Sequence, residues 1–227
     1  YTRPYSLILT RNTELSSLIS NDNLKPQVGR PKSCIKRDAI LHAASELFMD
    51  IGYARTSMDA IAQQAGVSKQ TVYSHFANKD ALFRSCIMSK VTAYGLDMRD
   101  TTPDTPLETV LTTIGGRLLD LLCDPGVVRM HALLIAETKE FATLAEDFWE
   151  NGPQATIDSL ARCLAESEDS RFAPIEDPHQ AAEDFLCMAE GHYLMRLLMH
   201  SISAIPEAEK AAHLERCVTQ FLRLHAK

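Results

Sequence analysis

The sequence lacks any apolar run long enough to cross a membrane, any C-x-x-C pair and the short motifs of common catalytic sites. A transmembrane helix needs about 20 apolar residues in a row. The missing motifs are G-x-S-x-G, the Walker A loop, H-E-x-x-H and G-x-G-x-x-G. The start of the chain also has no pattern of a cleavable signal peptide. These absences predict a cytoplasmic protein that is not an enzyme and has no cofactor or metal site.

Alternating strand patterns and disulfide frameworks are missing as well. The six cysteines are widely spaced and stand mostly inside apolar helical patterns, which is typical of reduced, buried thiols. A redox switch or a disulfide is the alternative. With no strand pattern and several stretches of helical periodicity, the sequence predicts an all-α fold of about nine helices.

Charge is abundant but divided unevenly along the chain, whose formal net charge is −7. Residues 30–90 carry nine Lys/Arg and five Asp/Glu, whereas residues 91–227 carry eleven Lys/Arg and 23 Asp/Glu. A basic N-terminal unit joined to an acidic C-terminal one is typical of a protein whose basic unit binds a polyanion.

Proline and glycine residues mark boundaries that divide the chain into three parts. We expect a flexible N-terminal arm (1–32), a three-helix domain (33–80) and a larger helical domain (81–227). Two of the C-terminal helices, those expected over 127–138 and 178–201, should be largely buried because their apolar residues face most directions. The expected helices span about 33–51, 58–65, 69–75, 79–97, 106–122, 127–138, 141–164 with a kink at Gly152-Pro153, 178–201 and 206–225.

The stretch "GVSKQTVYSHFANKD" (66–80) predicts a tight turn followed by a short recognition helix. Gly66 tolerates the positive φ of such a turn, and Ser68 can cap the helix. Val72 and Phe76, four residues apart, would anchor its inner side. The remaining polar side chains then point outward, as in a helix-turn-helix unit whose second helix enters a DNA groove.

Residues 33–83 resemble the DNA-binding domain of the tetracycline-repressor (TetR) family. The resemblance rests on "AILHAASELFMDIGYARTSMDAIAQQAGVSKQTVYSHFANKDALF". It implies an all-helical homodimer that represses transcription and leaves DNA when a small molecule binds its C-terminal body. Residues 91–200 also resemble, less specifically, the AefR-like subgroup. Gln70 departs from the Gly or Pro of many members, so base preference does not carry over.

The resemblance implies that recognition-helix side chains face DNA. Gln70 is the expected base reader because its amide can bond adenine twice, and Tyr73, His75 and Lys79 are expected phosphate contacts. For His75 a structural cap is the alternative. The arm "GRPK" can lie in a minor groove, or attract DNA nonspecifically. The full set is Arg30, Lys32, Thr56, Ser57, Ser68, Lys69, Gln70, Thr71, Tyr73, His75 and Lys79.

The C-terminal helices hold candidates for an adaptable apolar pocket with polar anchors, although plain core packing explains each of them too. These are Arg117, Met130, His131, Phe148, Trp149, Met188, His192 and Tyr193. The last two expected helices predict a dimer interface through Leu214, Val218, Phe221 and Leu222. The predicted function is a repressor released from a near-palindromic operator by a small molecule. The alternative is an activator, or a regulator that responds to a protein or to thiol oxidation.

Overall fold

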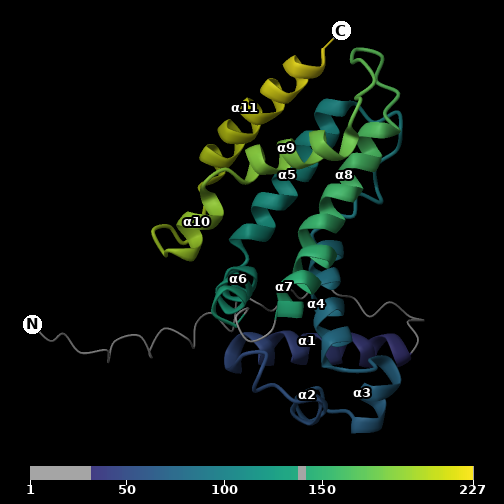
Figure 1. The fold of residues 1–227 in the computed structure, drawn as a ribbon, viewed down its shortest axis with the longest axis vertical. Helices are drawn as coiled ribbons and strands as arrows, with labels where there is room; N and C mark the ends of the chain where they lie inside the picture. The colour runs from purple at the N-terminus through teal and green to yellow at the C-terminus, as the bar shows by residue number, and fades with distance from the viewer. Residues whose placement is uncertain (1–31, 138–141, 227) are drawn as a thin grey trace, which may run out of the picture. The chain divides into compact units, whose positions relative to one another are not determined.

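The computed structural model describes residues 32–137 and 142–226, in which every regular element is a helix (Figure 1). The all-α fold class is therefore confirmed. Residues 37–226 pack as one unit. No helix in the described ranges has the length and hydropathy to cross a bilayer. The elements are α1 (Lys32–Ile51), α2 (Met58–Gln64), α3 (Lys69–His75), α4 (Lys79–Ala93), α5 (Leu107–Cys123), α6 (Pro125–Glu137), α7 (Ala142–Trp149), the π-helical turn η2 (Glu150–Gln154), α8 (Ala155–Ala165), α9 (Pro178–Glu190), α10 (Tyr193–Leu198) and α11 (Glu207–His225).

Helices α1, α2 and α3 share a small hydrophobic core with the start of α4. Phe48, Ile61 and Val72 are fully buried there, one from each of the three helices. The Phe48 ring lies 5.4 Å from that of Tyr53 and 5.6 Å from that of Phe83, measured between centroids. Aromatic contacts of this kind add to the burial of apolar area. Phe83 thereby holds α4 to the three-helix unit.

The turn between α2 and α3 depends on Gly66. Its φ is 65°, in the left-handed region, and no atom lies within 4 Å of the place where a Cβ would stand. Glycine is therefore needed for the backbone conformation and not for space. Ser68 then accepts a hydrogen bond from the Thr71 amide at 3.1 Å and caps α3. The predicted bounds of this helix are confirmed.

Helix α4 ends at Ala93, about four residues earlier than the sequence predicts. Gly95 follows with a φ of 67°, which stops the helix and turns the chain. Leu96 and Met98 are then fully buried in the C-terminal core. The Arg117 guanidinium donates to the Gly95 carbonyl at 2.9 Å and holds this turn. The apolar residues of this turn are therefore buried within a loop and not on the face of a helix.

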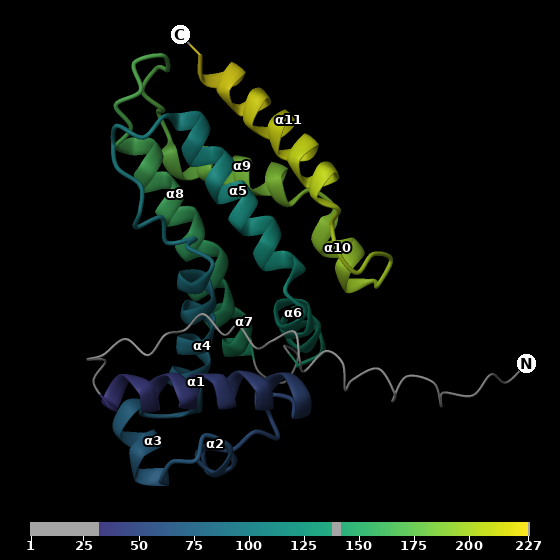
Figure 2. The ribbon, with the colours of Figure 1, turned by 180° about the vertical axis from the view of Figure 1, so that it is seen from behind.

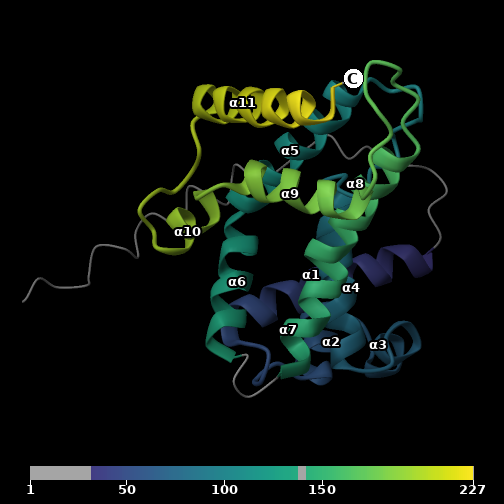
Figure 3. The same cartoon turned by 45° about the horizontal axis from the view of Figure 1, so that its top comes forward.

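The C-terminal core lies among α5, α8, α9 and α11. Figure 2 shows α5 between α8 and α11, and Figure 3 shows α9 crossing α5. A Cβ at Gly115 would stand 2.7 Å from a Leu214 methyl carbon and 3.6 Å from the Phe185 ring. Gly115 therefore allows α11 and α9 to approach α5 closely.

Two expectations for buried helices are wrong. Helix α6 is not buried on most sides: Val127 and Leu134 face inward, but Ile135 is 69% exposed. The expected helix over 178–201 is broken, because Gly191 has a φ of 55° and separates α9 from α10. A Cβ at Gly191 would also lie 3.3 Å from the His213 ring. The apolar residues beyond this break turn with α10 onto α5 and α6.

The expected kink at Gly152-Pro153 takes the form of the π-helical turn η2. Pro153 has no amide hydrogen, and its ring would clash with the carbonyl four residues earlier in an α-helix. Widening the turn removes that clash, and the chain continues as α8.

Candidate DNA interface and ligand cavity

Helix α3 has one buried side and one exposed side. Val72 and Phe76 are buried, as predicted, which fixes the rotation of the helix. Gln70 and Tyr73 are exposed on the outer side. Neither side chain makes a hydrogen bond to another described residue. The outer side therefore offers an amide and a phenol that are free to bond a ligand.

Lys69, at the start of α3, is tied to α2. Its ammonium lies 2.8 Å from one carboxylate oxygen of Asp59, and this exposed pair raises the pKa of Lys69 through its hydrogen bond and charge. Thr71 and His75 are half-buried. The Thr71 and Ser68 hydroxyls lie 2.8 Å apart, and the His75 ring lies 6.3 Å from that of Phe76. Each of these groups is thus partly engaged within the protein.

The start of α2 differs from the prediction at Thr56. Ser57 is the N-cap and is exposed, and it accepts from the Ala60 amide at 3.1 Å. Thr56 is buried, and its hydroxyl donates to the Gly52 carbonyl at 2.7 Å. The Thr56 hydroxyl is therefore not available as the phosphate donor that the sequence suggests.

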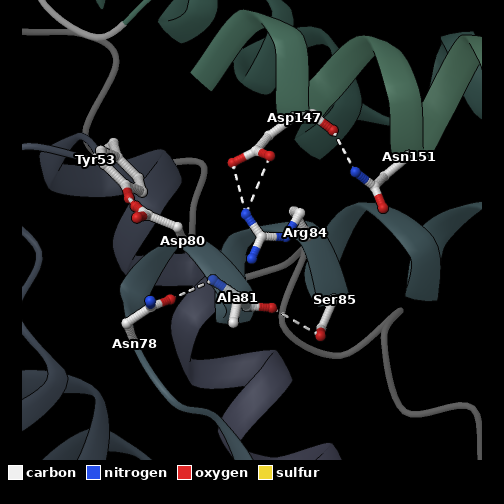
Figure 4. Close-up of polar contacts among 8 residues, drawn as sticks. All are labelled: Tyr53, Asn78, Asp80, Ala81, Arg84, Ser85, Asp147 and Asn151. Atoms are coloured by element: carbon white, nitrogen blue, oxygen red, sulfur yellow. Dashed lines mark hydrogen bonds and ion pairs between the residues drawn. The ribbon is translucent and has the colours of Figure 1, made fainter. Parts of the chain in front are cut away.

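Lys79 is similarly occupied. Its ammonium donates to the carbonyls of Tyr53 and Thr56 at 2.8 and 3.0 Å and lies 4.3 Å from the centre of the Tyr53 ring. The Tyr53 hydroxyl in turn donates to Asp80 (Figure 4). Burial, followed by the Asp80 hydrogen bond and charge, raises the pKa of Tyr53 well above its usual range. Lys79 thus braces the loop between α1 and α2.

The basic arm falls largely outside the described residues. Arg30 precedes the described range, and for Lys32 the backbone position alone, at the start of α1, is described. Both remain predictions.

A cavity of about 380 Å³ lies beside the three-helix unit. Its wall is overwhelmingly apolar and aromatic. Four of the predicted pocket residues line it, namely Met130, His131, Phe148 and Trp149. Trp149 is 47% exposed, so the cavity reaches solvent beside its ring. Further lining residues come from α1 (Ser45, Met49), α4 (Cys86, Ile87, Lys90, Val91), α5, α6 (Gly126, Val127), η2, α8, α9 and α10.

The other four predicted pocket residues do not line this cavity. Arg117 pairs with Asp100, and Met188 packs against the C-terminal core. His192 is exposed and stacks on Tyr193, with 4.8 Å between ring centres. The buried Tyr193 donates its hydroxyl to Glu209 at 3.1 Å. The break at Gly191 explains the absence of His192 and Tyr193, since it ends the helix that was expected to carry them along the pocket.

The sequence interpretation missed the ionisable groups of the cavity wall, Lys90, Glu183 and Glu190. The Lys90 ammonium lies 2.6 Å from an Asp124 carboxylate oxygen, and the Tyr94 hydroxyl donates to the same oxygen at 2.9 Å. Burial pushes the pKa of Asp124 upward, but these two hydrogen bonds hold it below its usual value. A carboxylate within the apolar run "FLCMAEGHY" is the signal that could have identified Glu190.

His131 is an ionisable residue of the cavity wall that the sequence analysis did predict. Its ring N–H donates to the Val127 carbonyl at 2.8 Å, and its ring meets that of Phe148 edge to face at 5.0 Å. Burial lowers the pKa of His131 against the raising effect of the Val127 carbonyl. Burial therefore favours the neutral form of the imidazole.

An ion pair joins α4 to α7, next to the aromatic residues of the cavity wall. One guanidinium nitrogen of Arg84, on α4, donates to both Asp147 carboxylate oxygens on α7, at 3.0 and 3.1 Å (Figure 4). Asn151 donates to the Asp147 carbonyl at 2.8 Å and holds the following turn. Phe148 and Trp149 come directly after Asp147, so this pair connects α4 to the aromatic wall.

Comparison with known proteins matches both halves of the chain to sequence models of one family. Residues 40–86 match the DNA-binding region of bacterial regulatory proteins of the TetR family. Residues 109–227, more than half of the chain, match the C-terminal domain of AefR-like transcriptional repressors. The chain belongs to the TetR family. It is a DNA-binding transcriptional regulator, as the resemblance implies.

Curated TetR-family relatives match this regulator mainly in its DNA-binding part. The transcriptional activator FasR of Mycolicibacterium smegmatis is 45% identical over 56 residues, which are 25% of this chain and 26% of FasR. The repressor ComR of Escherichia coli is 38% identical over 68 residues, 30% of this chain and 32% of ComR. The matches thus span about a quarter to a third of these relatives.

Solved structures of TetR-family proteins match over most of this regulator. A transcriptional regulator from Mesorhizobium loti is 27% identical, with a TM-score of 0.71 over 87% of this chain and 100% of the other. The flavonoid-responsive regulator FrrA is 32% identical, with a TM-score of 0.66 over 84% of this chain and 97% of FrrA.

Regulators of the TetR family act as dimers, and the predicted interface residues of this member lie mainly in its own core. Leu214, Val218 and Phe221 are buried against α5 and α9, so a single chain already covers the stripe of α11 that the sequence assigned to a partner. Leu222 is half-buried. The apolar side chains most exposed on α10 and α11, or just after α10, are Met195, Met199 and Leu224.

Proposed function

We propose that this regulator is a repressor that leaves a near-palindromic operator when a small molecule occupies the cavity. One observation carries the proposal: the cavity wall includes side chains of the DNA-binding unit itself. Ser45 and Met49 belong to α1, while Cys86 and Ile87 belong to the part of α4 that packs on α1. A ligand that prefers one position of these helices shifts the population of DNA-binding forms by its differential affinity.

The DNA contacts of this proposal lie on the outer side of α3. Gln70 reads a base edge, Tyr73 contacts a phosphate, and Lys69 exchanges its exposed partner Asp59 for a phosphate. The exposed Ser57 at the start of α2 offers a further donor. The half-buried Thr71 and His75 are secondary contacts.

The proposed dimer uses surfaces that a single chain leaves exposed. Met195, Met199 and Leu224 are 61%, 71% and 76% exposed, so a single chain leaves these large apolar side chains in water. A two-fold axis beside α10 and α11 removes such groups from water. It also presents two α3 helices to adjacent turns of the major groove, roughly 34 Å apart.

The first test is a DNA-release assay. An operator selected from genomic fragments would be bound to the protein and challenged with small apolar compounds, followed by transcription in vitro from the same operator. Release of DNA together with increased transcription is expected. Transcription that rises with protein added, in the absence of any compound, would instead support an activator.

Thiol oxidation is a less favoured trigger. Burial raises the pKa of the Cys86 thiol to about 11, so little reactive thiolate is present at neutral pH. Cys163 and Cys217 are also buried, and burial raises the pKa of each. If a peroxide released DNA from the wild type but not from a variant with all cysteines replaced by serine, this view would be wrong.

A further inference from the structure

The charge on the cavity wall is unbalanced. Lys90 is paired with Asp124, and burial lowers the pKa of His131 and so favours its neutral form. Glu183 and Glu190 also line the cavity, and neither forms an ion pair or hydrogen bond with another described residue. The net charge presented to an occupant is therefore negative.

The two carboxylates lie at different depths along α9. Glu183 and Glu190 are seven residues apart, which is about two helical turns, so they lie on the same side of the helix. Glu183 is exposed, whereas Glu190 is half-buried. Burial raises the pKa of Glu190, as expected for a carboxylate that has lost water without gaining a positive partner.

The Cys187 thiol lies between the two carboxylates on α9 and is subject to the same negative potential. Cys187 lines the cavity, and its pKa is raised first by burial and then by the negative charges of Glu183, Glu190 and Asp184. Both wall carboxylates therefore act on a single point of the wall. A positive group there is attracted by both carboxylates, although water screens the attraction because Cys187 and Glu183 are exposed.

The rest of the wall suits the remainder of such a molecule. Phe148 and Trp149 supply aromatic faces, to which cations and flat apolar bodies are both attracted. Trp149 and Glu183 are each exposed, so an aromatic ring and a carboxylate stand where the cavity meets solvent.

We infer that the effector is an amphipathic organic cation, with an aromatic or apolar body in the cavity and one positive charge beside Glu190. Glu183 attracts the cation at the mouth, and Glu190 holds it inside. The inference rests on the proposed function, since it assigns the chemical class of the molecule that releases DNA. Phenolic and other neutral compounds are the competing class.

The experiment uses two probes of nearly the same shape that differ in charge. Naphthyltrimethylammonium carries a positive nitrogen where tert-butylnaphthalene has a neutral carbon. Equilibrium dialysis would give the dissociation constant of each with the full-length protein, and an operator-bound sample would report DNA release. The wild type should bind the cation at least about tenfold more tightly than its neutral isostere.

The variants separate charge recognition from shape. Glu190→Gln keeps the size of the side chain and should reduce the preference for the cation to about twofold or less, with affinity for the neutral probe unchanged or higher. Glu183→Gln should have a smaller effect. Glu176→Gln removes the same charge from an exposed residue that does not line the cavity, and should keep the wild-type preference.

The outcomes are distinguishable. If the neutral probe binds as tightly as the cation and releases DNA, the inference fails while the proposed function stands. A cation preference that persists in the folded Glu190→Gln variant also overturns the role of Glu190. If neither probe binds or releases DNA, the result counts against both the inference and the ligand-released repressor.

Discussion

The Gln70 side chain is exposed on α3, and its amide makes no hydrogen bond to another described residue. An amide left free in this way can form two bonds to adenine in the major groove. Its neighbour Lys69 differs, because its ammonium is already paired with Asp59. Neighbouring residues of one helix are thus suited to different tasks, one to reading sequence and the other to adding charge.

Gln70→Ala should relax the preference at one base pair of each half-site. The expected loss on the preferred sequence is roughly 1–3 kcal/mol, with little change on random DNA. Competition binding against a set of operators that vary one position at a time would measure it. Equal losses on specific and random DNA would assign Gln70 to the phosphate backbone instead.

Lys79→Met should lower stability without changing the salt dependence of DNA binding. The substitution keeps an apolar side chain but leaves the Tyr53 and Thr56 carbonyls without their charged donor. A loss of roughly 1–3 kcal/mol in the free energy of unfolding is expected. Urea unfolding and binding over a range of salt concentrations would measure the two quantities.

Lys69→Met is the matched control for Lys79→Met. Lys69 is exposed and its loss should leave stability nearly unchanged, while the slope of log affinity against log salt falls by about one unit. If Lys79→Met instead reduced the slope by one unit and left stability intact, Lys79 would be a phosphate contact, as its place in the sequence suggests.

Among the elements, α5 is the one against which both α9 and α11 pack. Its two adjacent glycines face different surroundings. Gly115 meets Leu214, Phe185 and Ala189, whereas a Cβ at Gly116 would find its nearest neighbour, a Leu214 methyl carbon, at 3.9 Å. The close approach of the helices therefore depends on the first glycine, and the second is free to vary.

Gly115→Ala should destabilise the protein relative to Gly116→Ala. Both changes gain helix propensity of up to about 1 kcal/mol. In Gly115→Ala the new methyl group must displace the buried Leu214 side chain, and overpacking of this kind costs roughly 1–3 kcal/mol. Thermal unfolding would compare the two variants with the wild type. Equal stabilities would mean that Leu214 moves aside without cost.

The elements that the sequence predicts well are those set by local signals. Gly66, Val72 and Phe76 determine α3 within ten residues, because a turn conformation and a buried face are both visible in the residue types. The hydrogen bonds of Lys79 could not be predicted from the sequence, because its partners, the Tyr53 and Thr56 carbonyls, come from a distant loop. The Glu190 position on the cavity wall was missed for the same reason, since nine elements build that wall.

At the scale of the whole molecule, assembly depends on what one chain leaves uncovered. Phe221 is 1% exposed and its ring lies 5.5 Å from that of Phe185, so a charge at this position should unfold the monomer. Phe221→Glu is therefore not a test of the interface, although the apolar stripe of α11 suggests it.

The double variant Met195→Glu/Leu224→Glu should yield folded monomers with little operator affinity. Both side chains are largely exposed in the single chain, so the monomer fold should tolerate the charges, whereas an interface should not. Sedimentation and circular dichroism would measure association and folding, and Glu215→Gln serves as an exposed control. An intact dimer with normal DNA binding would mean that the interface lies elsewhere.

The π-helical turn η2 joins α7 and α8 into one continuous helical segment. The packing of that segment is sensitive to the insertion or deletion of a single residue in η2. A π turn holds one residue more than an α turn, so it offsets α8 relative to α7 by about 100° of helical rotation. Phe148 and Trp149 before it face the cavity, while Leu160 and Leu164 after it face the C-terminal core. Deleting Asn151 would rotate one set away from its partners, so a single-residue deletion here should be more harmful than most substitutions of the same residue.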